Sequence, residues 1–119
     1  MDNEKGISDI IEKWDIRKEH LTRCYRNREK VAVVEPMNEA IDDFLTFLCL
    51  INEKQFSSAE TETILESSQE FDYKPINFEE RISFILKKPH QYHSFVQLNE
   101  LYHELLKLHA IMKIRTQKK

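Results

Sequence analysis

The amino-acid sequence predicts an all-α fold, a bundle of four main helices with a fifth short helix allowed within residues 58–70. One glycine and three prolines in 119 residues are few helix breakers, which favours long helices joined by short turns. Apolar residues recur at steps of three and four along most of the chain, as they do on the buried face of a helix. No segment of useful length alternates between apolar and polar residues in the manner of a half-buried strand.

The first two helices are predicted from apolar stripes that face a common core. The first is expected over about residues 8–28, and the second from Pro36 to about Asn52. Proline suits a first helical turn because the N–H group that it lacks would be unpaired there. The apolar arc of the second helix is broad, which indicates the central helix of the bundle. The stripe of the first helix contains Ile7, Ile10, Ile11, Trp14, Leu21, Cys24 and Tyr25.

Residues 53–74 are poorer in apolar side chains, and this segment is expected to be the most mobile. Ser58, followed by several carboxylates, suits the N-terminus of the short helix. The third main helix then starts with Asn77 as its N-cap and ends before Pro89. Its inward-facing side chains are expected to be Phe78, Ile82, Ile85 and Leu86.

The last main helix is expected to begin with Ser94 as its N-cap and to carry an apolar stripe that reaches Met112. The whole chain, residues 1–119, is expected to form a single helical domain, since a chain of this length typically holds one core. Its ends are expected to fray at about residues 1–6 and 114–119.

Cysteine usage and hydropathy predict a cytoplasmic protein without a membrane segment. Cys24 and Cys49 lie far apart within helical patterns, which is neither a disulfide framework nor a metal-binding spacing. A reducing compartment is therefore expected. The acidic, polar start of the chain argues against a signal peptide. The longest apolar run, residues 44–51, is far shorter than a bilayer-spanning helix requires.

The net charge of −3 is distributed unevenly along the chain. Residues 1–30 carry 8 basic and 7 acidic residues, residues 31–80 carry 2 and 12, and residues 81–119 carry 8 and 2. Such asymmetry can indicate a charged partner. The alternative is that the acidic middle of the chain lies against the basic end within one fold.

The residues available exclude most standard enzyme signatures, and we expect no enzymatic activity, no catalytic residue and no cofactor. A single glycine cannot form a phosphate-binding loop, a dinucleotide fingerprint or a hydrolase elbow. Glu39, Asp42 and Asp43 are close enough on one helix to be considered as catalytic carboxylates. Helical carboxylates more often face water or an arginine of a neighbouring helix, and Arg17 or Arg81 is available for that role.

Four of the five histidines lie within residues 87–109, and they raise the question of a metal site. Glu100 and His103 have the spacing of half a di-iron unit, but the unit occurs once and Glu100 lies off the apolar stripe. His90 and His93 could chelate a metal from the turn, with His103 joining them only if the chain doubles back. We predict no metal site. The alternative is a structural hinge, in which these histidines bond to the free carbonyls at the end of the preceding helix.

The histidine-rich junction between the last two helices is the candidate interaction surface. It consists of His90, Tyr92, His93 and Phe95. Aromatic residues are enriched at the energetic centres of protein interfaces. We therefore expect a non-enzymatic protein-interaction module, whose partner is another protein or a second copy of the chain. In a small bundle, the same aromatics can instead belong to the core.

The rival function is association with nucleic acid. The basic side chains that would bind phosphates are Arg17, Arg23, Arg26, Arg28, Lys87 and Lys88, with residues 17–30 as the main basic segment. Tyr25, within that segment, could stack on a base. The negative net charge and the lack of a helix-turn-helix glycine argue against this alternative.

The segment "PINFEERISFILKKPHQYHSFVQLNELYHELLKL", residues 75–108, carries "Pro-x-Asn", "ERISFI" and the "KPHQYHSF" junction running into "QLNELY". It resembles the C-terminal part of YpoC-like proteins, a family of small bacterial proteins of unknown function. The remainder of the chain is similar to that family only in length and helical pattern. The resemblance implies a helical, cytosolic bacterial protein, and it carries over no catalytic or binding residue.

Overall fold

A computed structural model describes residues 3–54 and 61–117 of the chain. These residues form five α-helices and one short 3-10 turn, and they contain no strand. The elements are α1 (Asn3–Arg26), α2 (Val34–Ile51), α3 (Thr61–Ser67), the 3-10 turn (Ser68–Glu70), α4 (Phe78–Lys87) and α5 (Tyr92–Gln117). The all-α prediction is confirmed, and the short helix expected within residues 58–70 is α3.

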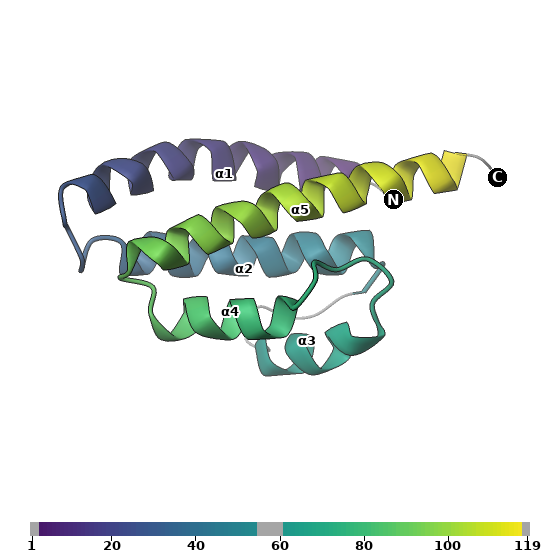
Figure 1. Ribbon diagram of the computed structural model, residues 1–119. Coiled ribbons are helices and arrows are strands. Elements are labelled where there is room, and N and C mark those ends of the chain that lie inside the picture. The colour runs from purple at the N-terminus through teal and green to yellow at the C-terminus, as the bar shows by residue number, and fades with distance from the viewer. Residues whose placement is uncertain (1–2, 55–60, 118–119) are drawn as a thin grey trace.

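The three long helices α1, α2 and α5 pack against one another, as Figure 1 shows. α4 packs on α5, and α3 packs on α2. α1 ends and α2 begins at the same end of the molecule at which α4 ends and α5 begins, on the left of Figure 1. Two loops that are distant in sequence, residues 27–33 and 88–91, therefore meet at that end.

Tyr102 lies at the point where the three long helices meet. Its ring, 1% exposed, stacks on the Trp14 ring of α1 with 4.3 Å between centroids. Its hydroxyl donates a hydrogen bond of 2.7 Å to the Ala40 carbonyl of α2. Phe44 of α2 packs edge-on against Tyr102 and also contacts Phe78 at the start of α4. One α5 side chain thus touches two other helices directly and a third through Phe44.

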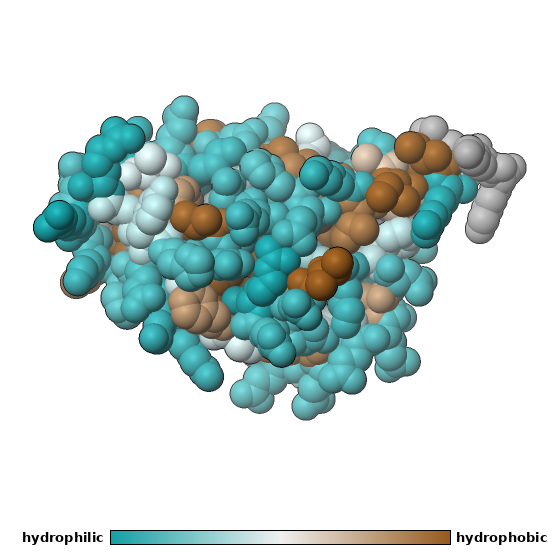
Figure 2. All heavy atoms as spheres, in the orientation of Figure 1, coloured by the Kyte–Doolittle hydropathy of each residue, from teal (hydrophilic) through white to brown (hydrophobic). Residues whose placement is uncertain are grey.

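Hydrophilic side chains dominate the face of the molecule shown in Figure 2, with a few hydrophobic ones gathered beside the far end of α5. Two isoleucines near that end, Ile111 and Ile114, are partly exposed. Exposed hydrophobic residues elsewhere are spread over other elements and include Ile16, Val31 and Ile76. Single exposed hydrophobic residues of this kind are normal on protein surfaces.

The charges of the three sequence segments pair differently from the expectation. Arg17 of α1 bonds to Asp43 (3.0 Å) and Glu39 (3.4 Å) of α2, which confirms one arginine partner predicted for these carboxylates. Glu4 of α1 pairs with His109 of α5 at 3.2 Å. Among the described residues, no ion pair joins residues 31–80 to residues 81–119. These two segments are held together by apolar packing and by hydrogen bonds such as that from Tyr102 to Ala40, and no ion pair among the described residues neutralises the basic charge of the last segment with the acidic middle.

Both ends expected to fray are helical as far as the structure describes them. α1 begins at Asn3, where Glu4 is held by His109 and where Ile7 is buried. α5 continues to Gln117. Fraying at about residues 1–6 and 114–119 stays a prediction, and within the described part of the chain residues 3–6 and 114–117 lie in α1 and α5.

α1 ends at Arg26, two residues before the predicted end, because Arg28 adopts a left-handed backbone conformation with φ of 58°. The N–H of Glu29 bonds to the Cys24 carbonyl and the N–H of Arg28 to the Tyr25 carbonyl. This is the Schellman motif, which usually has glycine at the left-handed position. α2 ends in the same way, with Glu53 at φ of 56°. Neither end carries the glycine that would have revealed it in the sequence.

The predicted N-cap of α4 is confirmed in position, whereas the predicted N-cap of α5 was wrong. Asn77 occupies the N-cap position of α4 with φ of 56°, but its side chain makes no capping hydrogen bond. α5 begins at Tyr92, and the Ser94 hydroxyl donates 2.6 Å to the Lys88 carbonyl at the end of α4 instead. Leu86, predicted to face inward, is 38% exposed. Ser58, the predicted cap of the short helix, lies outside the described residues.

Removing the Tyr102 hydroxyl is expected to weaken the contact between α5 and α2. Tyr102→Phe should lower the free energy of unfolding by about 1 kcal/mol, because one buried hydrogen bond is lost and the packed ring remains. The matched control is Tyr92→Phe, which removes a hydroxyl from an exposed ring and should leave stability unchanged. Urea denaturation of both variants checks the prediction. Equal midpoints for Tyr102→Phe and the parent protein would contradict the role given to this bond.

Relieving the left-handed strain at the end of α2 is expected to stabilise the fold. Glu53→Gly should raise the free energy of unfolding by about 1 kcal/mol, because glycine adopts positive φ without a Cβ clash. Thermal unfolding measures the change, with Glu62→Gly, inside α3, as a control that should destabilise. A lower melting temperature for Glu53→Gly would show that its side chain stabilises the fold by more than the strain costs.

Candidate functional site

The described residues offer neither a metal site nor a membrane span. Within residues 3–54 and 61–117, no cluster of three or more histidine, cysteine, aspartate or glutamate side chains is placed to hold a metal ion. The same part of the chain has no helix that is both long and apolar enough to cross a membrane. Glu100 and His103 are both exposed on α5, whereas His109 is buried against Glu4 and Phe47.

The two loops that meet at one end of the bundle form the candidate site. We call this region, residues 23–33 and 87–95, the junction end. The Tyr25 hydroxyl of α1 donates a hydrogen bond to the Pro89 carbonyl, which ties the two loops together. The Ser94 hydroxyl holds Lys88, and the N–H of Gln91 bonds to the Lys88 carbonyl at 3.1 Å. The backbone of the junction end is therefore fixed by hydrogen bonds from two helices.

The sequence-predicted interaction residues divide into an exposed group and a buried one. His90, Tyr92 and His93 are exposed, and Tyr92 retains 60% of its exposed area. Phe95 is only 6% exposed, so its ring cannot itself contact a partner, and its place in the predicted surface is corrected. The period of α5 explains this, because Phe95 falls on the inward stripe that continues to Leu98.

Phe95 instead supports the exposed rings from below. Its ring stacks on Tyr25 at 5.4 Å and lies 6.0 Å from Tyr92 and 6.1 Å from Trp14. Tyr92 packs edge-on against Tyr25 at 5.8 Å. The exposed Tyr92 ring thus stands at the edge of an aromatic cluster that extends into the core.

The contacts of His93 and of the carbonyls at the end of α4 bear on the predicted hinge role of the histidines. His93 packs edge-on against Phe84 of α4, with 5.4 Å between ring centroids, and lies 3.5 Å from the Gln97 side-chain nitrogen. The carbonyls at the end of α4 are bound by Ser94 and by Tyr25, not by histidine. The junction is a turn held by Ser94 and Tyr25, and the histidine-to-carbonyl bonds expected at the end of α4 are absent from its described hydrogen bonds.

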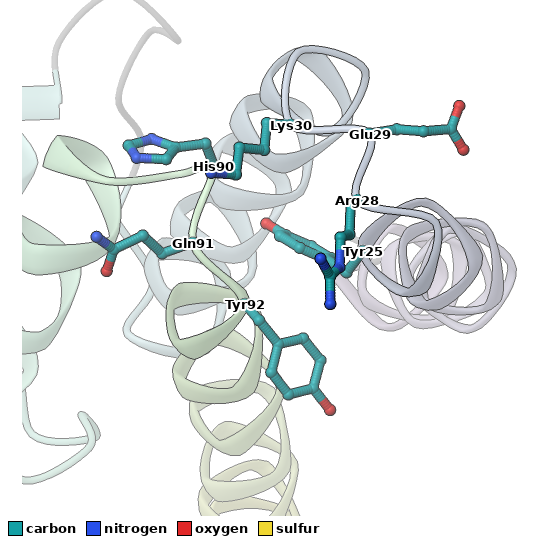
Figure 3. A pocket seen from close by; sticks show the side chains of 7 residues that line it. All are labelled: Tyr25, Arg28, Glu29, Lys30, His90, Gln91 and Tyr92. Atoms are coloured by element: carbon teal, nitrogen blue, oxygen red, sulfur yellow. The ribbon is translucent and has the colours of Figure 1, made fainter.

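A pocket of about 280 Å³ lies between the two loops (Figure 3). Tyr25 and Tyr92 provide aromatic walls from α1 and α5, and Arg28 and Lys30 provide cations from the α1–α2 loop. In Figure 3 the Arg28 side chain lies beside Tyr25 and Tyr92, whereas the Glu29 carboxylate points away from them. The full lining is Tyr25, Arg28, Glu29, Lys30, His90, Gln91 and Tyr92.

The basic residues of the rival prediction gather at the same end of the molecule, with one exception. Five of the predicted residues are exposed and have no ion-pair partner among the described residues: Arg23, Arg26, Arg28, Lys87 and Lys88. Lys30, at the end of the same basic segment, is likewise exposed and unpaired in that part of the chain. The exception is Arg17, whose guanidinium is neutralised by Asp43 and Glu39 of α2. Arg17 is therefore removed from the predicted phosphate-binding set, since its charge holds α1 to α2.

Two further features keep the junction end positively charged. α5 has no acidic residue in its first turn, whereas α1, α2 and α4 each have at least one. The positive end of the α5 dipole is therefore not offset by a carboxylate of its own first turn. Burial, with a smaller contribution from Cys24, raises the pKa of Tyr25 above its ordinary value, so this phenol stays neutral beside the pocket.

The Cys49 thiol and the carboxylates of α2 are the other side chains that could take part in chemistry, and their surroundings do not favour it. Burial raises the pKa of the Cys49 thiol to about 11, which keeps it protonated and unreactive at neutral pH. Burial, and then the charges of Asp43 and Glu39, raise the pKa of Asp42. Asp43 and Glu39 themselves face Arg17, which is the non-catalytic role considered for these carboxylates.

Comparison with known proteins identifies the family. The model of the YpoC-like protein family matches residues 4–117. The protein named "Uncharacterized protein YpoC" of Bacillus subtilis (strain 168) is 34% identical over 106 residues, which cover 89% of this chain. The chain spans 63% of the length of that relative. No solved structure gives a significant match.

The family match extends the sequence resemblance well beyond the segment that first indicated it. That resemblance covered residues 75–108, whereas the family match also includes α1, α2 and the acidic middle of the chain. The junction end lies wholly within the matched region. The chain belongs to the YpoC-like protein family.

Proposed function

We propose that the chain is a non-enzymatic interaction module that docks an acidic segment of a protein partner on its junction end. The observation that carries the proposal is the Tyr92 ring, which is 60% exposed and lines a pocket with Arg28 and Lys30, two cations without ion-pair partners among the described residues. Aromatic residues and arginine are the side chains most enriched at the energetic centres of interfaces.

The packing beneath Tyr92 supports this role. Phe95 and Tyr25 contact the Tyr92 ring, and both also belong to the aromatic cluster that reaches Trp14. An anchor held in place by its own core loses little conformational freedom on binding. Tyr92 can therefore contribute contact area without a large entropic cost.

The charge of the junction end supports an acidic partner. Cations without internal partners steer an oppositely charged surface and improve the association rate. A second copy of the chain offers such a surface, because Glu62, Glu66, Glu70 and Asp72 are exposed around α3. Self-association is therefore one of the outcomes that the experiment below must separate from binding to another protein.

The proposal includes a cytoplasmic location and no catalytic step. Both cysteines are free and buried, which suits a reducing compartment. Cell fractionation with an antibody against the chain tests the location, and a membrane-pelleted protein would contradict it.

The docking role predicts that exposed junction residues affect binding and not stability. The tagged double variant Tyr92→Ala/His93→Ala should recover markedly less partner from a lysate of the source organism than the parent does. Its melting temperature should change little, because Tyr92 lies largely in solvent. Pull-down followed by mass spectrometry, with and without nuclease, measures the loss. Partners retained by the variant, or lost from the parent after nuclease treatment, would argue against the proposal.

Ile76→Ala is the matched control for that experiment. Ile76 is 79% exposed and precedes α4 at the opposite end of that helix from the junction end. It should retain all partners. Light scattering of the purified parent protein tests self-association. If its mass rises with concentration, and the mass of Tyr92→Ala is lower at the same concentration, the partner is a second copy of the chain.

Nucleic acid is a second candidate function, favoured by six exposed cations within the junction end, where the Tyr92 ring is also exposed. Each phosphate contact on duplex DNA contributes about −0.9 to the slope of log affinity against log salt. The double variant Arg23→Gln/Arg26→Gln should therefore make the slope less negative by about 2. Fluorescence anisotropy with labelled duplex and single strands over a salt series measures it.

Lys5→Gln/Lys107→Gln is the control for this second candidate. It removes the same number of charges from two exposed positions outside the junction end, and it should leave the slope nearly unchanged. Equal slopes for both double variants would indicate non-specific attraction, and no binding at low salt would remove nucleic acid as a candidate.

A further inference from the structure

We infer that the pocket between the α1–α2 loop and the start of α5 binds a phosphomonoester, carried by a phosphorylated side chain of the docked protein segment. The inference rests on the proposed function, because it assigns the chemistry of one group within that segment. In this inference, the pocket is the specific binding site within a surface that is otherwise broadly basic.

Charge matching selects a dianion over a carboxylate. Arg28 and Lys30 both line the pocket, and neither has an ion-pair partner among the described residues. Glu29 also lines it, but its carboxylate is directed away from Arg28 and the two tyrosine rings (Figure 3). A phosphomonoester carries about −1.5 to −2 at neutral pH, whereas a carboxylate or a phosphodiester carries a single charge. Two cations facing one pocket are best neutralised by the more highly charged group.

The donors in the pocket suit phosphate geometry. The planar guanidinium of Arg28 presents several N–H groups in a fixed fork that matches two phosphate oxygens. The Lys30 ammonium supplies a mobile point charge that can reach a third oxygen. The Tyr25 hydroxyl donates its proton to the Pro89 carbonyl, so this donor is not available to a bound phosphate.

The walls and the volume limit what carries the phosphate. The Tyr25 and Tyr92 rings give the pocket apolar sides, against which the carbon atoms of a side chain can pack. A volume of about 280 Å³ is at the small end of ligand pockets, which typically measure about 300–1,000 Å³. The pocket therefore accommodates one phosphorylated side chain and is too small for a large cofactor.

The backbone at Arg28 makes the pocket a fixed feature of the fold. The left-handed conformation of this residue ends α1, and two hydrogen bonds of the Schellman motif hold it there. The Arg28 Cα is thus positioned by the end of a 24-residue helix, not by a free loop. The opposite wall, Tyr92, is the first residue of α5.

Nuclear magnetic resonance titration of the full chain with O-phosphotyrosine tests the inference. We expect saturable shifts confined to the amides of residues 28–30 and 90–92, with no shifts from unphosphorylated tyrosine. Arg28→Gln should weaken the binding by about tenfold, the loss expected for a charge-assisted hydrogen bond. Arg26→Gln, the matched change at an exposed arginine outside the pocket lining, should weaken it less than twofold.

Each contrary result has a defined meaning. Equal losses from Arg28→Gln and Arg26→Gln would overturn the pocket in favour of a diffuse basic surface. Tighter binding of deoxyadenosine 5′-monophosphate than of O-phosphotyrosine at the same amides would move the phosphate source from a protein to a nucleotide and overturn the inference. Absence of saturable shifts with either probe would also overturn it.

The pull-down separates failure of this inference from failure of the proposed function. If partners depend on Tyr92 but survive Arg28→Gln and phosphatase treatment of the lysate, the docking role stands and the phosphate subsite falls. If O-phosphotyrosine binds at Arg28 while no partner depends on Tyr92, the subsite stands alone and the docking role falls.

Discussion

The contact between Tyr102 and its two neighbouring helices is the interaction on which the rest of the structure depends. A bundle built from three long helices needs one residue that fixes the rotation of each helix about its own axis. Tyr102 does this with two kinds of force: its face stacks on Trp14, and its hydroxyl reaches the backbone of α2 at Ala40. Apolar packing alone tolerates sliding and rotation, whereas a buried hydrogen bond to a particular carbonyl does not.

The geometry of the junction end follows from that contact. Once the rotation of α5 is set, Phe95, two turns before Tyr102, must point inward and Tyr92 must stand outward at the first turn. α1 is fixed by Trp14, so Tyr25, three turns later, meets the same aromatic cluster and ties the second loop through Pro89. The core therefore places an aromatic and two cations from distant parts of the chain around one small hollow.

The helices could be predicted from the sequence, but the way they end could not. Apolar residues at three- and four-residue steps revealed α1, α2, α4 and α5 because burial of one helix face leaves that period in any sequence. The left-handed turns that end α1 and α2 were not foreseen, because Arg28 and Glu53 occupy positions at which glycine is the usual signal. The end of α2 itself was predicted to within one residue, at about Asn52.

The candidate site was predicted as two separate surfaces, and only the fold shows that they are one. Tyr92 and His90 were selected for their aromatic surroundings, and Arg28 for its charge, because sequence reasoning works within short segments. Their meeting depends on a contact between residues 64 positions apart, Tyr25 and Pro89. Arg17 and Phe95 were assigned to surfaces for the same reason, and tertiary packing uses one for an ion pair and the other for the core.

The backbone conformation of Arg28 places stability and recognition in opposition at a single position. Glycine would end α1 at lower conformational energy, so selection for a more stable fold favours losing this arginine. An arginine kept at positive φ carries a standing energetic cost that only a use for its side chain would offset. Among family members, the residue at this helix end should therefore indicate whether the pocket is in use. Relatives with glycine there would lack the guanidinium and would have a more stable helix end.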